Sequence, residues 1–260
     1  MNNPREGAQA VPTSESDLLV YLWGISDDED WIRANSRWSL DTARVFGLAP
    51  RLAGIGFDPR PLDRYEHKVL ARLFVLRELL QPLPDSQIVL IMDAFDTLFL
   101  GTGQQIVATF RNQKTQILVS AERAYTYQWA EYRHKFDTID SPYRYVNAGT
   151  IIGYAGALRY LAQTCIAYLG QGFAHGNDQG LLGKFVFDTF DTPSFVRLDT
   201  SCELFWVTTR DAEALRESPF RNPVTDTRPL ILHVIGGGRE HAQLYREIGQ
   251  SILGAGDPPR

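Results

Sequence analysis

Two aspartates follow directly after an unbroken hydrophobic run. Residues 88–92 read Ile-Val-Leu-Ile-Met, and Asp93 and Asp96 come next. Such a run predicts a strand that is buried on both faces. Carboxylates at the carboxyl end of such a strand lie where open α/β sheets bind ligands, and they suit Mg²⁺ or Mn²⁺ together with a diphosphate. The alternative is that one aspartate caps the next helix and the other is a solvated turn residue.

A second hydrophobic run, residues 229–235, carries His233 and leads into three consecutive glycines: Gly236, Gly237 and Gly238. A single histidine in a hydrophobic strand is usually a core residue whose hydrogen bonds are satisfied. The glycines favour another interpretation, because exposed backbone N–H groups before a helix form an anion site.

Two further positions offer polar groups in hydrophobic surroundings. Asn147 and Gly149 interrupt the strand expected at 144–154, which allows close backbone approach and provides an amide that both donates and accepts. Asp178 and Gln179 open the helix expected around 181–187. Asp178 can bind an acceptor hydroxyl or act as a base, or it can simply be the helix N-cap or a first-turn residue.

The bulk properties exclude several classes of protein. The chain has 260 residues, a net charge of −5 and a pI near 5.6, which argue against nucleic acid or an anionic membrane surface as the main partner. Cys165 and Cys202 cannot form a disulfide framework. No hydrophobic stretch approaches the roughly 20 residues of a membrane span. Residues 1–16 read as a disordered leader and not as a signal peptide, so a cytoplasmic location is the expectation.

Strand and helix patterns alternate along the chain, which predicts an α/β protein. Strands are expected at 17–22, 88–92, 116–120, 144–154, 195–198, 204–207 and 229–235. Helices are expected at 27–46, 67–80, 104–110, 155–169, 181–187 and 240–253. In the helix at 67–80 the apolar residues repeat at helical spacing, and Lys68, Arg72 and Arg77 lie off that face. Residues 50–63, rich in Pro and Gly, read as a loop able to close over a ligand. Residues 123–145 are rich in aromatic side chains that suit either the core or stacking on a sugar or base.

These pieces, in this order, resemble the glycosyltransferase domain of the procollagen lysyl hydroxylases and their viral and bacterial relatives. The matching segments are 18–20, 67–69, 91–100, 119–122, 144–154, 177–179, 198–199 and 233–238. The resemblance covers about residues 17–245. It implies a single GT-A domain over residues 17–260, with a Rossmann-like, mixed and mostly parallel sheet flanked by helices.

The resemblance also implies an activity. A hexose, galactose or glucose, would pass from a UDP-sugar donor to the hydroxyl of a hydroxylysine-type or glycan acceptor, with Mn²⁺ or Mg²⁺ bound. The implied metal ligands are Asp93, Asp96 and His233. The implied donor-binding residues are Lys68, Phe95, Trp23, Gly236, Gly237 and Gly238. The residues implied on the sugar and acceptor side are Asn147, Asp178 and Gln179.

The sequence departs from the family pattern in two places. The acidic run before Asp178 is reduced to His175-Gly-Asn, and the tryptophan that the family offers to the uracil has no match in residues 50–66. Phe57 and Tyr65 are the substitutes expected there. An iron-binding His-x-Asp…His pattern is missing, so we expect sugar transfer without lysine hydroxylation.

Two other functions fit parts of the sequence. Residues 92–99 also resemble the first motif of haloacid-dehalogenase-like phosphatases, in which Asp93 would be the covalent nucleophile. Against this reading, a strand and two helices precede the motif, and Asp188 with Asp191 is a weak candidate for the second acidic pair. The other alternative is a protein that binds UDP-sugars without turning them over.

Overall fold

The computed structural model describes residues 17–56, 65–126, 129–171, 177–208, 212–217, 220–236 and 238–254, with only the backbone described at 65–69, 170, 212, 213, 217 and 238. The expected leader at 1–16 lies outside these residues, as do Gly237, Phe57 and the side chains of Lys68 and Tyr65. In the described part, no helix combines the length and the hydrophobicity that crossing a lipid bilayer requires.

A six-stranded sheet forms the centre of the molecule, in the order β2-β1-β3-β6-β5-β7. Its strands are β1 (Leu18–Ser26), β2 (Arg51–Ile55), β3 (Ile88–Asp93), β5 (Ile117–Glu122), β6 (Tyr145–Tyr154) and β7 (Val196–Asp199). Within the described part of this sheet, β6 alone runs antiparallel to its neighbours, and the other pairs are parallel. The prediction of a mixed, mostly parallel sheet flanked by helices is therefore confirmed.

A smaller second sheet was not predicted. It has the order β4-β9-β8, and its strands are β4 (Thr97–Phe99), β8 (Phe205–Thr208) and β9 (Ile231–Val234). The three-residue β4 begins immediately after Asp96, and its antiparallel register places Thr97 opposite His233. This pairing joins two segments that are more than a hundred residues apart in the sequence.

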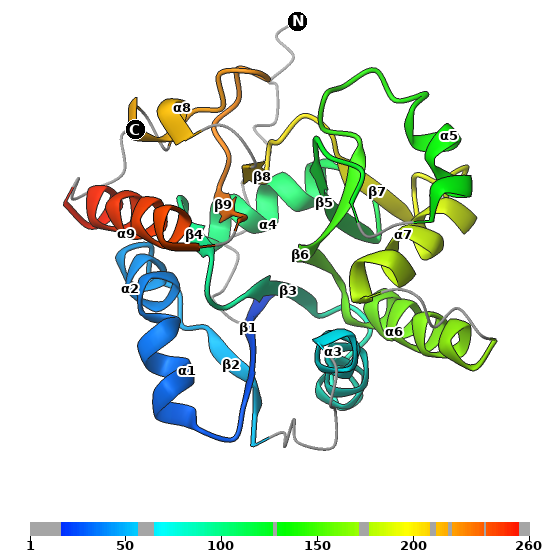
Figure 1. Cartoon of the computed structure of the whole chain (residues 1–260). Helices are drawn as coiled ribbons and strands as arrows, with labels where there is room; N and C mark the ends of the chain where they lie inside the picture. The colour runs from blue at the N-terminus through cyan, green and yellow to red at the C-terminus, as the bar shows by residue number, and fades with distance from the viewer. Residues whose placement is uncertain are drawn as a thin grey trace, which may run out of the picture.

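Two groups of helices lie beside the sheets (Figure 1). One group packs together and consists of α3 (Tyr65–Leu80), α6 (Ala155–Gly170) and α7 (Asp178–Asp188). The other consists of α1 (Glu29–Asn35), α2 (Arg37–Val45) and α9 (Gly238–Gly254), with α2 in contact with both α9 and β4. The remaining helices are α4 (Gly103–Asn112), α5 (Arg133–Phe136), preceded by a 3₁₀ turn at Ala130–Tyr132, and α8 (Ala212–Glu217).

Two expectations about local structure were wrong. The single helix expected at 27–46 is broken at Ser36, which caps one helix and starts the next while its hydroxyl bonds the Ile32 carbonyl at 2.7 Å. Residues 51–55 are not part of a loop but form β2, which pairs with β1. Gly54 sits in this strand at φ +91°, where an added Cβ would lie 2.5 Å from the Gly24 carbonyl oxygen. A glycine in this position hides the strand from pattern-based prediction.

Candidate metal and donor site

The segment from Asp93 to Thr97 is held by hydrogen bonds to β1, to β9 and within the turn itself. Asp93 ends β3 and lies beside Trp23 of β1. The Ala94 N–H donates to the Trp23 carbonyl at 2.8 Å, and the Val234 N–H donates to the Asp96 carbonyl at 2.8 Å. The Thr97 hydroxyl bonds back to the Asp93 carbonyl. The separation of the two aspartates is therefore fixed by both sheets.

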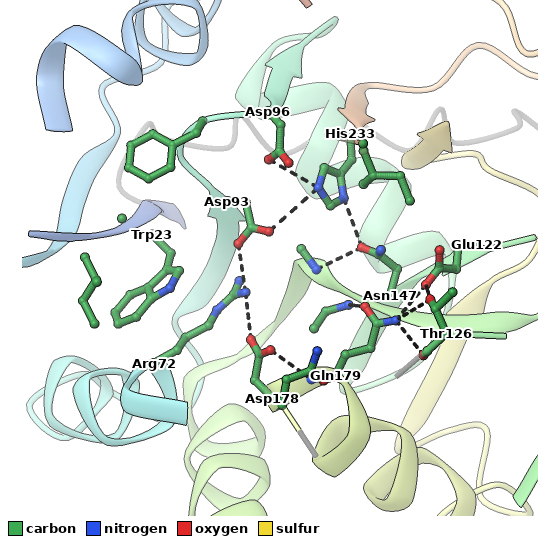
Figure 2. A pocket seen from close by; sticks show the side chains of 18 residues that line it. Trp23, Arg72, Asp93, Asp96, Glu122, Thr126, Asn147, Asp178, Gln179 and His233 are labelled. Carbon is green, nitrogen blue, oxygen red and sulfur yellow. Dashed lines mark hydrogen bonds and ion pairs between the residues drawn. The ribbon is translucent and has the colours of Figure 1, made fainter. Parts of the chain in front are cut away.

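The structure brings His233 to these two aspartates. Its Nε2 lies 3.3 Å from Asp96 Oδ1 and 3.8 Å from Asp93 Oδ2. One potential ligand atom from each of the three residues falls within 4.8 Å of the others. Figure 2 shows the three side chains converging on a common point. They come from β3, the turn that follows it and β9, so the fold itself assembles the cluster.

Asn147 sets the orientation of the imidazole. Its Oδ1 lies 3.0 Å from His233 Nδ1 and also accepts the Gly149 N–H at 2.9 Å. Because an amide oxygen only accepts, His233 must donate from Nδ1, which leaves Nε2 of the neutral ring with a lone pair facing the carboxylates. A polar group that orients a histidine in this way is typical of metal sites.

The residues present fit a divalent cation. His233 Nε2 and Asp96 Oδ1 are both buried and have no hydrogen-bond partner among the described residues. Two carboxylate oxygens and one imidazole nitrogen form a mixed donor set that suits Mn²⁺ better than Mg²⁺. Burial raises the pKa of Asp93 to about 6, although Arg72 opposes the shift. Burial lowers the pKa of His233, but the Asp96 and Asp93 carboxylates outweigh it, so the net shift is upward.

Arg72 is part of the site, a role that was not predicted from its position in the sequence. It lies on α3 with only 3% of its surface exposed. One guanidinium nitrogen, Nη1, contacts Asp93 Oδ1 at 3.0 Å and Asp178 Oδ2 at 3.4 Å. Its Nε and Nη2 are buried and have no partner among the described residues. The helical pattern placed Arg72 off the apolar face of α3. In the structure the side chain of Arg72 nevertheless lines the pocket.

Asp178 lies in the first turn of α7, and Asn177 is the N-cap because its side chain accepts the Gly180 N–H at 3.1 Å. The first-turn interpretation of Asp178 is thus correct, yet the carboxylate also faces the pocket and Arg72. Burial raises its pKa, and Arg72 again opposes the shift.

Gln179 and Glu122 form a second polar group in the pocket. The Gln179 amide donates to Glu122 Oε1 at 2.7 Å and accepts the Ala148 N–H at 3.2 Å. Thr126 donates to the same Glu122 oxygen at 2.9 Å. Glu122 is 1% exposed, and burial raises its pKa. No role was assigned to Glu122 from the sequence, although it ends the segment 119–122 that matches the family.

The pocket itself has a volume of about 450 Å³ and lies at the carboxyl ends of β1 and β3. Trp23, Ile25 and Phe95 form an apolar part of its wall, and Gly236 also lines it. Gly24 allows Phe95 to pack closely, since a Cβ there would meet the Phe95 ring at 2.7 Å.

Trp31 does not line the pocket but packs against Phe95, a contact that was not predicted from the sequence. It is 48% exposed, and its ring lies edge-on to Phe95 with the centroids 5.4 Å apart.

The aromatic segment 123–145 serves mainly the core. Phe136 and Tyr143 are fully buried, and Tyr125, Trp129 and Tyr132 pack partly buried against the core. None of these rings lines the pocket. Among the described residues of this segment, only Thr126 does so.

The acidic pair that the phosphatase alternative requires lies elsewhere. Asp188 pairs with Lys184 at 2.8 Å and Asp191 with Lys135 at 3.2 Å. Neither residue lines the pocket that contains Asp93.

Comparisons with known proteins agree with this geometry. The family model of the PLOD GT domain matches residues 40–247. A glycosyltransferase involved in the glycosylation of the major capsid of PBCV-1 superposes with a TM-score of 0.55 at 11% identity, over 90% of this chain and 98% of that one. Galactosyltransferase LgtC, solved with donor and acceptor sugar analogues, gives 0.51 at 16% identity, over 90% and 95%. These likenesses confirm the predicted GT-A fold. No curated protein matches the chain in sequence.

Proposed function

The chain belongs to the PLOD glycosyltransferase-domain family, and from this premise we propose that it transfers a hexose from a UDP-sugar to an acceptor hydroxyl with the help of a divalent cation. The family match supports a glycosyltransferase and gives no sign of a phosphatase. One observation carries the proposal: Asp93, Asp96 and His233 converge within 4.8 Å at the edge of a 450 Å³ pocket.

Asp93, Asp96 and His233 would hold the cation, which we propose to be Mn²⁺. When bound, the cation neutralises the charge that develops on the leaving diphosphate as the sugar–phosphate bond breaks. Asn147 keeps the imidazole in the tautomer that presents Nε2. This makes Asn147 a positioning residue in addition to the sugar-side residue that we expected.

The donor nucleotide would lie along the wall of Trp23, Ile25 and Phe95. Backbone N–H groups at Gly236 and at Gly238, the first residue of α9, suit the diphosphate. Lys68 and Gly237 remain proposed donor contacts outside the described side chains.

The transferred sugar would lie in the pocket beside the cation site and Asp178. Arg72 Nη1 holds the Asp178 carboxylate at 3.4 Å, and that carboxylate can accept from sugar hydroxyls. The Gln179 amide is bonded to Glu122 and to the Ala148 N–H, so its orientation in the pocket is fixed. An acceptor hydroxyl, of a hydroxylysine-type or glycan acceptor, would approach beside these groups.

The direct test is a hydrolysis and transfer assay against a panel of UDP-sugars in the presence of Mn²⁺ and of EDTA. We expect at least one UDP-hexose to be cleaved to UDP, and we expect EDTA to abolish the reaction. A protein that is inert toward every UDP-sugar with Mn²⁺ present contradicts the proposal. The assay also separates an enzyme from a protein that binds UDP-sugars without turnover.

Changing Arg72 to lysine tests the sugar side separately from the nucleotide side. Lysine keeps the charge beside Asp93 but loses the planar guanidinium whose Nη1 contacts Asp93 and Asp178 together. We expect kcat/KM for the UDP-hexose to fall by roughly 10–100-fold, the loss of one or two charged hydrogen bonds, while the affinity for UDP stays within about threefold. Arg77→Lys, on the same helix but bonded to the exposed Glu78, is the matched control. Equal loss of affinity for UDP and for UDP-hexose would contradict the assignment of Arg72 to the sugar.

The affinity for the cation should depend on pH. Asp93 has a pKa raised to about 6, and that of His233 is raised above its ordinary value, so both groups hold protons that the cation must displace. Protons compete more strongly as the pH falls, so we expect Mn²⁺ to bind tightest at the alkaline end of the range and to weaken by about tenfold per pH unit for each ligand once the pH is below its pKa, which for Asp93 is about 6. Calorimetric titrations between pH 5.5 and 8.5, in two buffers of different ionisation enthalpy, measure this proton release. An affinity that is constant across the range is incompatible with these two ligands.

A further inference from the structure

Two buried hydroxyl groups lie beneath the turn that carries Asp93 and Asp96. Ser39 of α2 has its Oγ 2.7 Å from the Ala94 carbonyl oxygen and 2.7 Å from the Thr97 carbonyl oxygen. Tyr245 of α9 has its hydroxyl 2.9 Å from Ser39 Oγ and 3.1 Å from the Thr97 carbonyl oxygen. Ser39 is fully buried and Tyr245 is 5% exposed, so water does not replace these contacts.

Both hydroxyls are needed to satisfy the Ala94 and Thr97 carbonyl oxygens. The two carbonyl oxygens need donors, and each hydroxyl has one proton to give. With both residues present, Ser39 can donate to Ala94 and Tyr245 to Thr97. With one removed, a single proton has to serve two buried carbonyls, which leaves one of them unsatisfied.

Each of these two carbonyls belongs to the residue that directly follows one of the aspartates. Ala94 directly follows Asp93, and Thr97 directly follows Asp96, so fixing both carbonyls fixes the direction of both carboxylates. Contacts of α2 with both β4 and α9 make the three elements one packed unit, as Figure 1 shows. Ser39 and Tyr245 do not line the pocket, so they reach it only through this backbone.

We propose that Ser39 and Tyr245 are positioning residues that set the spacing of the Asp93 and Asp96 carboxylates for the cation. This rests on the proposed function, because it assumes that the cluster binds a metal. Outer contacts that orient metal ligands are typically worth 10–100-fold in metal affinity. The hydroxyl of Tyr245 therefore acts on the site from the C-terminal helix without contacting substrate.

The test is the affinity of the metal-free protein for Mn²⁺, measured from the free-ion signal in electron paramagnetic resonance titrations at pH 8. Tyr245→Phe keeps the ring and removes only the hydroxyl, and Ser39→Ala removes the second one. We expect each to weaken Mn²⁺ binding by about tenfold. Melting temperature is recorded for every variant without metal.

Thr42→Val is the matched control. Thr42 lies three residues after Ser39 on the same helix, and its hydroxyl accepts the Phe99 N–H of β4 at 3.2 Å, beyond the aspartate turn. This variant should lower the melting temperature by an amount similar to Tyr245→Phe and leave the Mn²⁺ affinity within twofold of wild type. A merely structural role for Tyr245 predicts the same behaviour in both variants.

The outcomes are distinguishable. Weaker Mn²⁺ binding in Tyr245→Phe with unchanged binding in Thr42→Val supports the inference. Wild-type affinity in Tyr245→Phe overturns it and leaves the proposed function standing, and this variant decides the matter if Ser39→Ala does not fold. A wild-type protein that binds no Mn²⁺ overturns the proposed function and this inference with it.

Discussion

Replacing Asp96 with asparagine should abolish Mn²⁺ binding and reduce UDP-hexose cleavage by about 10³-fold or more, as expected when a reaction loses the charge that stabilises its transition state. The reason is geometric and electrostatic. Asp96 Oδ1 is buried, faces His233 Nε2 at 3.3 Å and has no hydrogen-bond partner among the described residues. Asparagine keeps the size of the side chain but removes the negative charge that a cation needs.

The control for this variant is Asp191→Asn. Asp191 is 86% exposed and pairs with Lys135 outside the pocket, so its loss should change neither metal binding nor cleavage. It also belongs to the acidic pair considered for a phosphatase, which would require it. Full metal-dependent activity in Asp96→Asn would show that the cluster is not the cation site.

Substituting alanine for Gly149 should have an effect nearly as large, although Gly149 offers no side chain of its own. A Cβ at this position would lie 2.0 Å from Cε1 and 2.6 Å from Nδ1 of His233. β6 is buried along nearly its whole length, and residues on both sides of Gly149 are paired with β5 or β3, so the backbone has little room to retreat. The imidazole must therefore leave its place and lose its bond to Asn147. We expect Mn²⁺ affinity to fall by about 100-fold, the upper end for losing a ligand's orientation, and cleavage to fall with it.

A second glycine of the same strand provides the comparison. A Cβ at Gly153 would lie 2.8 Å from the Gln116 carbonyl oxygen, a comparable clash far from the imidazole. Gly153→Ala should lower the melting temperature while the folded protein binds Mn²⁺ normally. If Gly149→Ala were to bind Mn²⁺ as the wild type does, His233 could not be a ligand in the position seen here.

The parts of the site that could be predicted are those that depend on residues adjacent in the sequence. The hydrophobic run before Asp93 marks β3, because a strand covered on both faces needs no polar alternation. The prediction that Asp93, Asp96 and His233 converge is confirmed as geometry, while their roles as ligands remain proposed. Convergence depends on pairing β4 with β9, and a three-residue strand carries too little pattern to be recognised.

Other parts could not be predicted because they depend on tertiary contacts. The burial of Arg72 follows from the packing of α3 against α6 and α7, which turns a charged helix face toward the pocket. The bond from Asn147 to His233 joins residues 86 positions apart. The contacts of the Ser39 and Tyr245 hydroxyls could not be predicted either. The periodic pattern of a helix indicates which of its faces is apolar, but not which distant carbonyl groups its hydroxyls will meet.

The central claim is that three side chains hold a cation beneath a nucleotide diphosphate. Its most direct test is the affinity of UDP for the wild-type protein and for His233→Gln, measured by calorimetry with Mn²⁺ and with EDTA. Linkage predicts that Mn²⁺ tightens UDP binding to the wild type by roughly 10–100-fold and that this gain disappears in His233→Gln. Equal affinity for UDP with Mn²⁺ and with EDTA in the wild type would contradict the claim.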